Sequence, residues 1–246
     1  MTLLSTRKLS RSFGGLRAVD SVDFDLPAGE IRAIIGPNGA GKTTFVSLVC
    51  GRVVPDRGEI VFEGQNIASL PAFRRVQLGI AYTFQITSIF KNLTALENIA
   101  LAAQNAANRP SNNVDDVVAR SDSVSGRAAA ALDRVGLSHQ SSAKAGELPY
   151  GHQRLLEVAM ALALVPKLLI LDEPTQGLSD SEIADFCNLV RDISSEATVL
   201  LIEHNMTVVM DLAQRITVMN QGRILAEGTP AEIRANEAVQ HAYLGA

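Results

Sequence analysis

Eight consecutive residues have the types and the spacing of a phosphate-binding loop. Residues 36–43 read Gly-Pro-Asn-Gly-Ala-Gly-Lys-Thr and fit the pattern G-x-x-x-x-G-K-[ST]. Glycines let backbone N–H groups turn toward a polyphosphate, and the N-terminus of a following helix adds its positive dipole end. Lys42 can reach the β- and γ-phosphates, and the Thr43 hydroxyl can ligate Mg²⁺. A plain glycine-rich turn is the alternative, but it needs no Lys-Thr pair at its end. We therefore expect a nucleoside triphosphate site.

Two acidic residues follow a second apolar segment. Leu168–Leu171 is a continuous apolar run, typical of a parallel strand buried on both faces, and Asp172 and Glu173 come directly after it. Ligands of open α/β sheets bind at the carboxyl ends of the strands. There Asp172 can hold Mg²⁺, directly or through water, and Glu173 can orient and polarise an attacking water. A polar strand end that caps the next helix is the alternative. The run Asp-Glu-Pro-Thr beside a phosphate loop favours catalysis.

Four further features carry groups whose role the residue types alone leave open. His204 follows the apolar run Val199–Ile202, where its imidazole can donate to a γ-phosphate, although a single histidine is usually structural. Gln85 can bind a metal ion or water, or it can be a plain surface residue. Residues 148–154 (Leu-Pro-Tyr-Gly-His-Gln-Arg) precede a predicted helix and form either an anion site or an ordinary turn. Phe13 can stack on a base or belong to the core.

The segments around these residues predict an α/β fold. Strands are expected at 3–9, 19–26, 31–35, 59–62, 80–83, 168–171 and 198–202, with a closing hairpin of 216–219 and 223–226 that turns at Gln221-Gly222. Helices are expected at 42–50, 127–135, 153–165, 182–194 and 206–214. The polar stretch 105–125 is predicted to be a loop that can contain one short helix. We expect an α/β core that carries the phosphate loop, with a helical subdomain inserted at about residues 72–165.

Composition limits the classes of function. The chain has 246 residues and 47% hydrophobic residues, enough for one large domain or a domain with a subdomain. Its net charge of −4 argues against a protein that binds nucleic acid by bulk attraction to phosphates. Its first residues predict no signal peptide, and no run reaches the ~18 apolar residues of a membrane span. Cys50 and Cys187 lack metal-ligand spacing and fit small buried residues in a reducing compartment. These features predict a cytoplasmic protein that reaches a membrane only through a partner.

Taken in order, these motifs resemble the ATP-binding subunit of ATP-binding-cassette (ABC) transporters, over essentially the whole chain. The matching elements are the phosphate loop, Gln85, the signature 148–153, the acidic pair 172–173 and His204. The resemblance implies one P-loop ABC ATPase domain, with a core and N-terminal antiparallel β-subdomain at about 1–71 and 166–246, and a helical subdomain at about 72–165. It also implies that ATP lies between two such domains, where the signature of one closes on the phosphate loop of the other.

The same resemblance implies roles for individual residues. Phe13 stacks on adenine, Gln85 senses the nucleotide, Glu173 is the base and His204 stabilises the transition state, with Lys42 and Gln85 counted among the catalytic residues. The Mg²⁺ ligands are Thr43, Gln85 and Asp172. The nucleotide site comprises Phe13, Gly36, Asn38, Gly39, Ala40, Gly41, Lys42, Thr43, Thr44, Tyr150, Gly151 and Gln153.

A narrower likeness links the chain to the ATPases of branched-chain amino acid and related amide importers. It rests on residues 13–16, 83–85, 90–94, 150–151, 202–204 and 242–245. The likeness implies an energy-coupling subunit on the cytoplasmic face of the inner membrane, with a second ATP-binding subunit, permease subunits and, indirectly, a substrate-binding protein, and without nucleic acid. A lipopolysaccharide-export ATPase, a soluble ABC ATPase and a regulatory nucleotide binder are the alternatives.

Three positions depart from the family pattern. Pro149 replaces a signature serine whose hydroxyl and N–H would face the γ-phosphate of the opposite subunit, and proline supplies neither. Ser179 and Asn205 stand where the family often has Asp. Pro149 should weaken the site that this signature completes, and the importer likeness implies that unlike pairs are typical. We therefore expect the working dimer to pair the chain with a different ATPase subunit, and a homodimer is the alternative.

Overall fold

A computed structural model describes residues 1–83, 88–107 and 124–244, with side chains for all of these except 105–107 and 243–244. The chain divides into two compact units, one of residues 1–75 and 191–246 and one of residues 76–190. Helices α2 (Ala72–Leu78) and α7 (Asp180–Ser194) contain the two points where the chain passes from one unit to the other.

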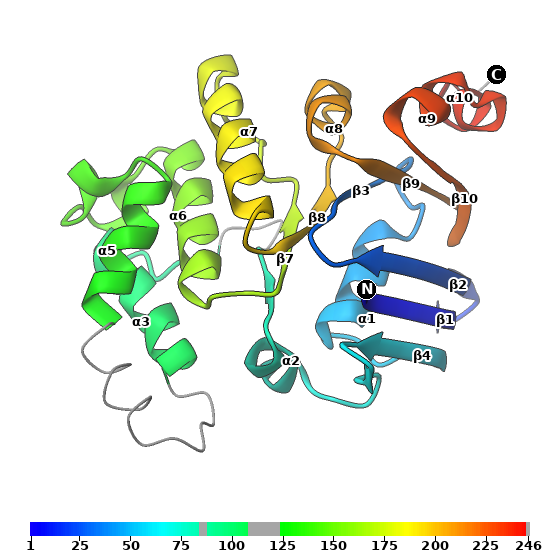
Figure 1. The fold of residues 1–246 in the computed structure, drawn as a ribbon, viewed down its shortest axis with the longest axis horizontal. Coiled ribbons are helices and arrows are strands. Elements are labelled where there is room, and N and C mark those ends of the chain that lie inside the picture. Colours follow the sequence, from blue (N-terminus) through cyan, green and yellow to red (C-terminus); the bar gives the residue numbers. More distant parts are fainter. Residues whose placement is uncertain (84–87, 108–123, 245–246) are drawn as a thin grey trace. The chain divides into compact units, whose positions relative to one another are not determined.

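The first unit contains an antiparallel sheet in the strand order β2-β1-β4-β5 (Figure 1). Its strands are β1 (Thr2–Phe13), β2 (Leu16–Pro27), β4 (Arg57–Phe62) and β5 (Gln65–Asn66). Alternate side chains of β2 and β4 point inward, so Leu26 and Ile60 are buried while their neighbours reach solvent, and at the start of β1 both Leu3 and Leu4 are buried. The ring of Phe24 meets Phe45 of helix α1 (Lys42–Cys50) edge-on, with centroids 5.3 Å apart. This contact packs the sheet against the helix that follows the phosphate loop.

The same unit holds the parallel strands that position the loop. Strand β3 (Ile31–Ile35) pairs in parallel with β8 (Thr198–Ile202) on one side and β9 (Arg215–Asn220) on the other. Strand β10 (Arg223–Gly228) pairs antiparallel with β9 through a turn in which Gln221 (φ 48°) and Gly222 (φ 77°) both adopt positive φ, as predicted for a two-residue hairpin. Helices α8 (Met206–Leu212), α9 (Pro230–Ala235) and α10 (Glu237–Leu244) share a core with β3 and β9.

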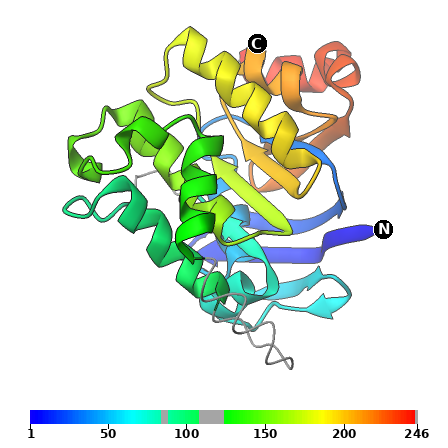
Figure 2. The ribbon, with the colours of Figure 1, turned by 60° about the vertical axis from the view of Figure 1, so that its left-hand side comes forward.

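The second unit combines two parallel strands with a group of helices. Strand β6 (Ile80–Tyr82) pairs with β7 (Leu168–Asp172). Helices α3 (Ala95–Ala107), α5 (Val124–Arg134) and α6 (Tyr150–Ala163) lie side by side, as Figure 2 shows, and two short 3₁₀ turns, η1 (Ser138–Gln140) and η2 (Ala145–Glu147), precede α6. Fully buried alanines such as Ala103, Ala128 and Ala159 allow the helices to approach closely.

The predicted fold class is confirmed, and most differences lie at element ends. Strands β3 and β8 and helix α1 (Lys42–Cys50) have the predicted bounds. Strand β1 runs four residues past its predicted end, because its outer part pairs through backbone bonds that the apolar pattern does not reveal. The loop predicted at 105–125 is wrong at its two ends, since residues 105–107 belong to α3 and 124–125 to α5. Residues 108–123 and Gln85 lie outside the described residues.

Candidate nucleotide site

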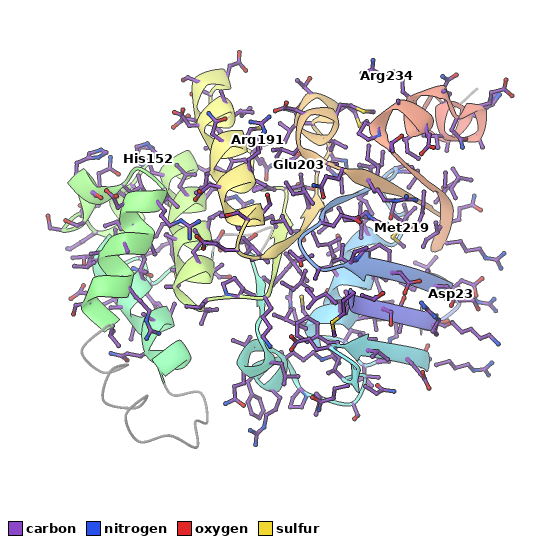
Figure 3. All side chains as sticks on the ribbon, viewed as in Figure 1. Asp23, His152, Arg191, Glu203, Met219 and Arg234 are labelled. Carbon is purple, nitrogen blue, oxygen red and sulfur yellow. The ribbon has the colours of Figure 1, made fainter. Side chains whose placement is uncertain are left out.

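The phosphate loop connects β3 to α1 and requires glycine at two positions. Gly36 (φ 153°) and Gly41 (φ 99°) adopt positive φ, where a side chain is strained. A Cβ on Gly36 would also strike the carbonyl oxygen of Met219, and a Cβ on Gly41 that of Ala18 (Met219 is labelled in Figure 3). The glycine pattern of the loop therefore has a steric cause on both of its flanks.

Lys42 turns back over the loop that precedes it. Its side chain is only 7% exposed, and Nζ donates to the carbonyl oxygens of Gly36 (2.7 Å) and Pro37 (3.1 Å). Within the described residues no side chain caps α1 at Gly41, so the helix begins with its first N–H groups directed into the loop. Thr43 is exposed in the first turn. An ammonium group, a helix N-terminus and a hydroxyl thus converge at one place, which suits a polyphosphate.

Backbone hydrogen bonds hold the rest of the loop in place. Ala40 donates its N–H to Pro37 (3.1 Å) and accepts one from Gly222 (3.0 Å), whose own carbonyl accepts from Asp20 (2.8 Å). The hairpin turn of β9 and β10 therefore joins the loop to β2. Among the predicted loop residues, Asn38 and Gly39 stay exposed, Thr44 is half-buried and Ala40 is buried.

His204 lies at the same sheet edge as the phosphate loop. Strands β3 and β8 are parallel and in register, with Ile34 opposite Ile202, so the residues after both strands emerge together. The buried Glu203 (labelled in Figure 3) accepts the N–H groups of His204 (2.8 Å) and Asn205 (3.0 Å). These bonds fix the backbone of His204 and leave its side chain exposed.

Asn205 is the N-cap of α8. Its Oδ1 accepts the N–H groups of Thr207 (3.1 Å) and Val208 (3.4 Å). Asn and Asp are about equally good N-caps. The departure from the family pattern at this position therefore costs the helix little.

In the second unit Asp172 is a buried carboxylate with specific partners. It is 1% exposed, and Oδ2 accepts the hydroxyl of Tyr82 at 2.7 Å. Its backbone N–H donates to the Thr83 hydroxyl at 3.2 Å. Sequence reasoning did not identify Tyr82 as a partner. The signal was its parallel register with Ile170, two residues before the acid.

Glu173 follows in an unusual backbone conformation. Its φ of 50° lies in the left-handed region, which residues other than glycine and asparagine seldom adopt. Such conformations cost about 1–3 kcal/mol and gather at functional sites. The strained turn directs the chain away from β7 immediately after the carboxyl end of the strand.

The signature motif forms the start of α6. Pro149 is the N-cap residue, Tyr150 is exposed, and Gly151 is buried against Leu178 and the Gly177 carbonyl, which leave too little space for a Cβ. Gln153 does not point outward. Its amide donates to the Leu148 carbonyl (2.8 Å) and supports the turn.

A buried ion pair lies one turn further along α6. Arg154 and Glu157 are 3.3 Å apart, and Glu157 also accepts the N–H of Ser88, just beyond the Gln85 segment in sequence. Burial raises the pKa of Glu157, against the opposing effects of the Ser88 N–H and the Arg154 charge. Sequence reasoning missed this pair, because charged residues in a helix are normally expected at its surface.

Phe13 ends β1 in the first unit, and Ser179 directly precedes α7 in the second. Phe13 is 46% exposed and carries the Arg11 guanidinium 4.9 Å from its ring centroid, so it is not part of the core. Ser179 accepts the N–H of Glu182 (3.4 Å) and returns its own N–H to the Glu182 carboxylate (2.7 Å), which is a capping box at the start of α7.

The predicted residues therefore form two groups. Lys42, Thr43 and His204 share one sheet edge in the first unit, and Asp172, Glu173 and the signature belong to the second. The hydroxyl of Thr43 and the carboxylate of Asp172 are hard oxygen donors of the kind that Mg²⁺ prefers. The described residues contain no cluster of three or more His, Cys, Asp or Glu side chains that could hold a metal. Mg²⁺ is usually bound by one or two carboxylates together with substrate phosphates, and each of these two groups is chemically suited to that role.

Comparison with known families decides the identity. Residues 19–176 match the profile of the family described as ABC transporter. The chain belongs to this family. It is an ATP-hydrolysing cassette with the α/β fold of that family. Residues 223–246 also match a second profile, described as branched-chain amino acid ATP-binding cassette transporter.

Curated relatives cover the chain almost completely. The high-affinity branched-chain amino acid transport ATP-binding protein LivG of Escherichia coli strain K12 is 39% identical over 99% of this chain and 98% of the relative. BraF of Pseudomonas aeruginosa, with the same description, is 39% identical with the same coverage. The lipopolysaccharide export system ATP-binding protein LptB of Haemophilus influenzae is 32% identical over 100% of this chain and 98% of the relative.

Solved structures similar to this chain are also ABC transporter cassettes. A nucleotide-free ATP-binding cassette from an ABC transporter superposes with a TM-score of 0.86 at 29% identity, and the ADP conformation of an ABC transporter cassette with 0.85 at 29%. Both comparisons cover 100% of each chain. In the described part of this chain, no helix is both long and apolar enough to cross a membrane.

Proposed function

We propose that this chain is an energy-coupling subunit of an importer for branched-chain amino acids or related amides. The observation that carries the cargo class is the match of residues 223–246 to the branched-chain profile, beside 39% identity to LivG. The chain would act on the cytoplasmic face of the membrane, bound to permease subunits and to a second ATP-binding subunit.

In this proposal the first unit binds the triphosphate. Backbone N–H groups of residues 36–43 and the N-terminus of α1 surround the phosphates, while Lys42 moves its Nζ from loop carbonyls to phosphate oxygens. Thr43 and Asp172 would hold Mg²⁺, which when bound neutralises charge on the β- and γ-phosphates. Phe13 would offer one face of its exposed ring to adenine.

Hydrolysis is assigned to Glu173 and His204. Glu173 accepts a proton from the attacking water and orients it toward the γ-phosphorus. His204 donates to the γ-phosphate and stabilises the charge that develops during the reaction. The Glu203 carboxylate supports this role because it fixes the His204 backbone.

The second ATP-binding subunit is proposed to be a different chain. Pro149 at the N-cap of α6 offers neither hydroxyl nor N–H, and a hydrogen bond to a charged phosphate is worth about 1.5–3 kcal/mol. The site that this signature completes would therefore be weaker than one completed by a serine-bearing partner. A pair of unlike subunits with two unequal sites accommodates this difference.

The permease is proposed to dock beside Phe90. This side chain is 56% exposed, although Asn98, which is fully buried, binds both the Phe90 N–H (2.8 Å) and its carbonyl (3.1 Å). A rigid backbone that presents an aromatic ring to solvent suits a binding partner. The half-buried Ile89 and Leu93 would extend this apolar surface.

Lipopolysaccharide export is the second candidate function, supported by 32% identity to LptB. The test of both candidates is reconstitution of the chain with the permease and ATPase subunits that co-purify with it. Uptake of leucine into ATP-loaded vesicles supports the proposal. Reconstituted complexes that hydrolyse ATP but bind and move no amino acid contradict it. Full, cooperative ATPase activity of the purified chain alone contradicts the proposal that the working dimer contains two different ATPase subunits.

A further inference from the structure

His152 occupies the fifth position of the signature motif, next to Gly151 on α6. Its Nδ1 lies 2.9 Å from Oε1 of Gln140, and its Nε2 lies 3.5 Å from Oε1 of Glu182 on α7 (His152 is labelled in Figure 3). The His152 side chain is 24% exposed and the Glu182 side chain is 34% exposed. The signature helix and the start of α7 are thus joined through one imidazole ring.

The roles of the two ring nitrogens depend on the tautomer of His152. If Gln140 presents its carbonyl oxygen, Nδ1 donates to it. If the Gln140 amide is turned over, Nδ1 accepts and Nε2 carries the proton of the neutral ring, which then faces the Glu182 carboxylate at 3.5 Å.

Glu182 is also hydrogen-bonded to Ser179. Its other oxygen, Oε2, accepts the backbone N–H and the hydroxyl of Ser179, both at 2.7 Å. The Ser179 N–H, followed by the Ser179 hydroxyl, lowers the pKa of Glu182, and His152 acts in the same direction against partial burial. A continuous chain of contacts therefore runs from His152 through Glu182 to Ser179.

The loop between Glu173 and Ser179 also touches the signature at its middle. A Cβ on Gly177 would strike the Tyr150 ring, and a Cβ on Gly151 would strike Leu178. The loop is thus held against α6 at two points. A cavity of about 330 Å³ beside His152 is lined by Asp133, Arg134 and Asp185 as well as Glu182, so further charged side chains lie near the outer contact.

We propose that His152 is a positioning residue that fixes the Ser179 end of this loop to the signature turn. By this link, a displacement of Glu173 or its loop in one nucleotide site is carried to Tyr150 and Gly151, which the proposed function places in the opposite site. The contact itself does not depend on the proposed function, whereas its consequence for coupling between the two sites does.

The first test measures the contact in the full chain by amide hydrogen exchange. Asn at position 152 keeps a donor near Nδ1 but is too short to reach Glu182, whereas Gln places an amide near Nε2. We expect His152→Asn to speed exchange at residues 179–182 about two- to fivefold, the range of partly exposed ion pairs, and His152→Gln to leave it near the wild-type rate. The exposed His139→Asn is the matched control. Equal exchange in the Asn and Gln variants would overturn the inference.

The second test measures coupling between sites, with the second ATP-binding subunit present. We expect His152→Asn to lower the Hill coefficient of ATP hydrolysis toward 1, and His152→Gln to restore it. If the wild type is cooperative and the His152→Asn variant has the same Hill coefficient, the positioning role of His152 is refuted. A wild type that shows no ATP hydrolysis refutes the proposed function instead. The hydrogen-exchange experiment still tests the His152–Glu182 contact independently of that result. Should the Asn variant not fold, Glu182→Gln is expected to lower the coefficient too, and an unchanged value counts against the inference.

Discussion

Replacing Tyr82 by phenylalanine removes one hydroxyl from beside a buried acid. The Tyr82 hydroxyl donates to Asp172 Oδ2 at 2.7 Å, and Asp172 is 1% exposed, so water replaces the lost donor poorly. A hydrogen bond to a charged group is worth about 1.5–3 kcal/mol. Each kcal/mol lowers the melting temperature of a chain of this size by about 2–4 °C, so we expect a decrease of about 3–12 °C.

The same change tests the role of Asp172. Removing an outer-shell partner of a metal ligand typically costs about 10–100-fold in metal affinity or activity. We therefore expect Tyr82→Phe to raise the Mg²⁺ concentration for half-maximal phosphate release at least about tenfold. Melting curves without Mg²⁺ separate this effect from stability. A lower melting temperature with an unchanged Mg²⁺ requirement would refute the assignment of Asp172 as a ligand.

Three further results are expected. Gly41→Ala should abolish binding of a fluorescent ATP analogue, because its Cβ would strike the Ala18 carbonyl at a φ of 99°; binding within about threefold of wild type would contradict the steric argument. Asn205→Ala should lower unfolding free energy by about 1 kcal/mol in urea titrations, whereas Asn205→Asp should change it by only a few tenths; equal losses would exclude the capping role. The Thr229 N–H lowers the pKa of Glu232 below its ordinary 4.5, so the ionised form adds stability above that pH and loses it as pH falls. The melting temperature of Glu232→Gln should accordingly differ from that of wild type at pH 7, and the two melting temperatures should converge below pH 4.5. A constant difference across that pH range would refute the stabilising role of the Glu232 carboxylate.

The sequence predicts features whose cause is local. The loop from Gly36 to Thr43 is defined by backbone torsions and by a lysine at fixed spacing, so the strand before it and the helix after it were predicted with the observed bounds. The apolar run before Asp172 likewise identifies a buried strand end. In both cases the information lies within about ten consecutive residues.

Features that depend on distant contacts could not be predicted. The Tyr82–Asp172 bond joins residues 90 positions apart and requires the register of two strands. Arg75 is another example. Its guanidinium is buried and donates to the carbonyls of Leu48 (2.6 Å) and Val49 (2.8 Å) at the end of α1, although arginine in a short helix is expected at the surface. Such a position becomes visible only when the carbonyls at a helix end are assigned partners.

The most direct test of the central claim is phosphate release by Glu173→Gln beside wild type, at saturating ATP and Mg²⁺. Glutamine keeps the size and one acceptor of the side chain but cannot take a proton from water. We expect the variant to bind ATP as tightly as wild type, to lose steady-state turnover by at least about 100-fold, and to accumulate as an ATP-bound dimer with its partner subunit. Turnover at the wild-type rate in a variant that binds ATP normally would remove Glu173 from the reaction and contradict the account.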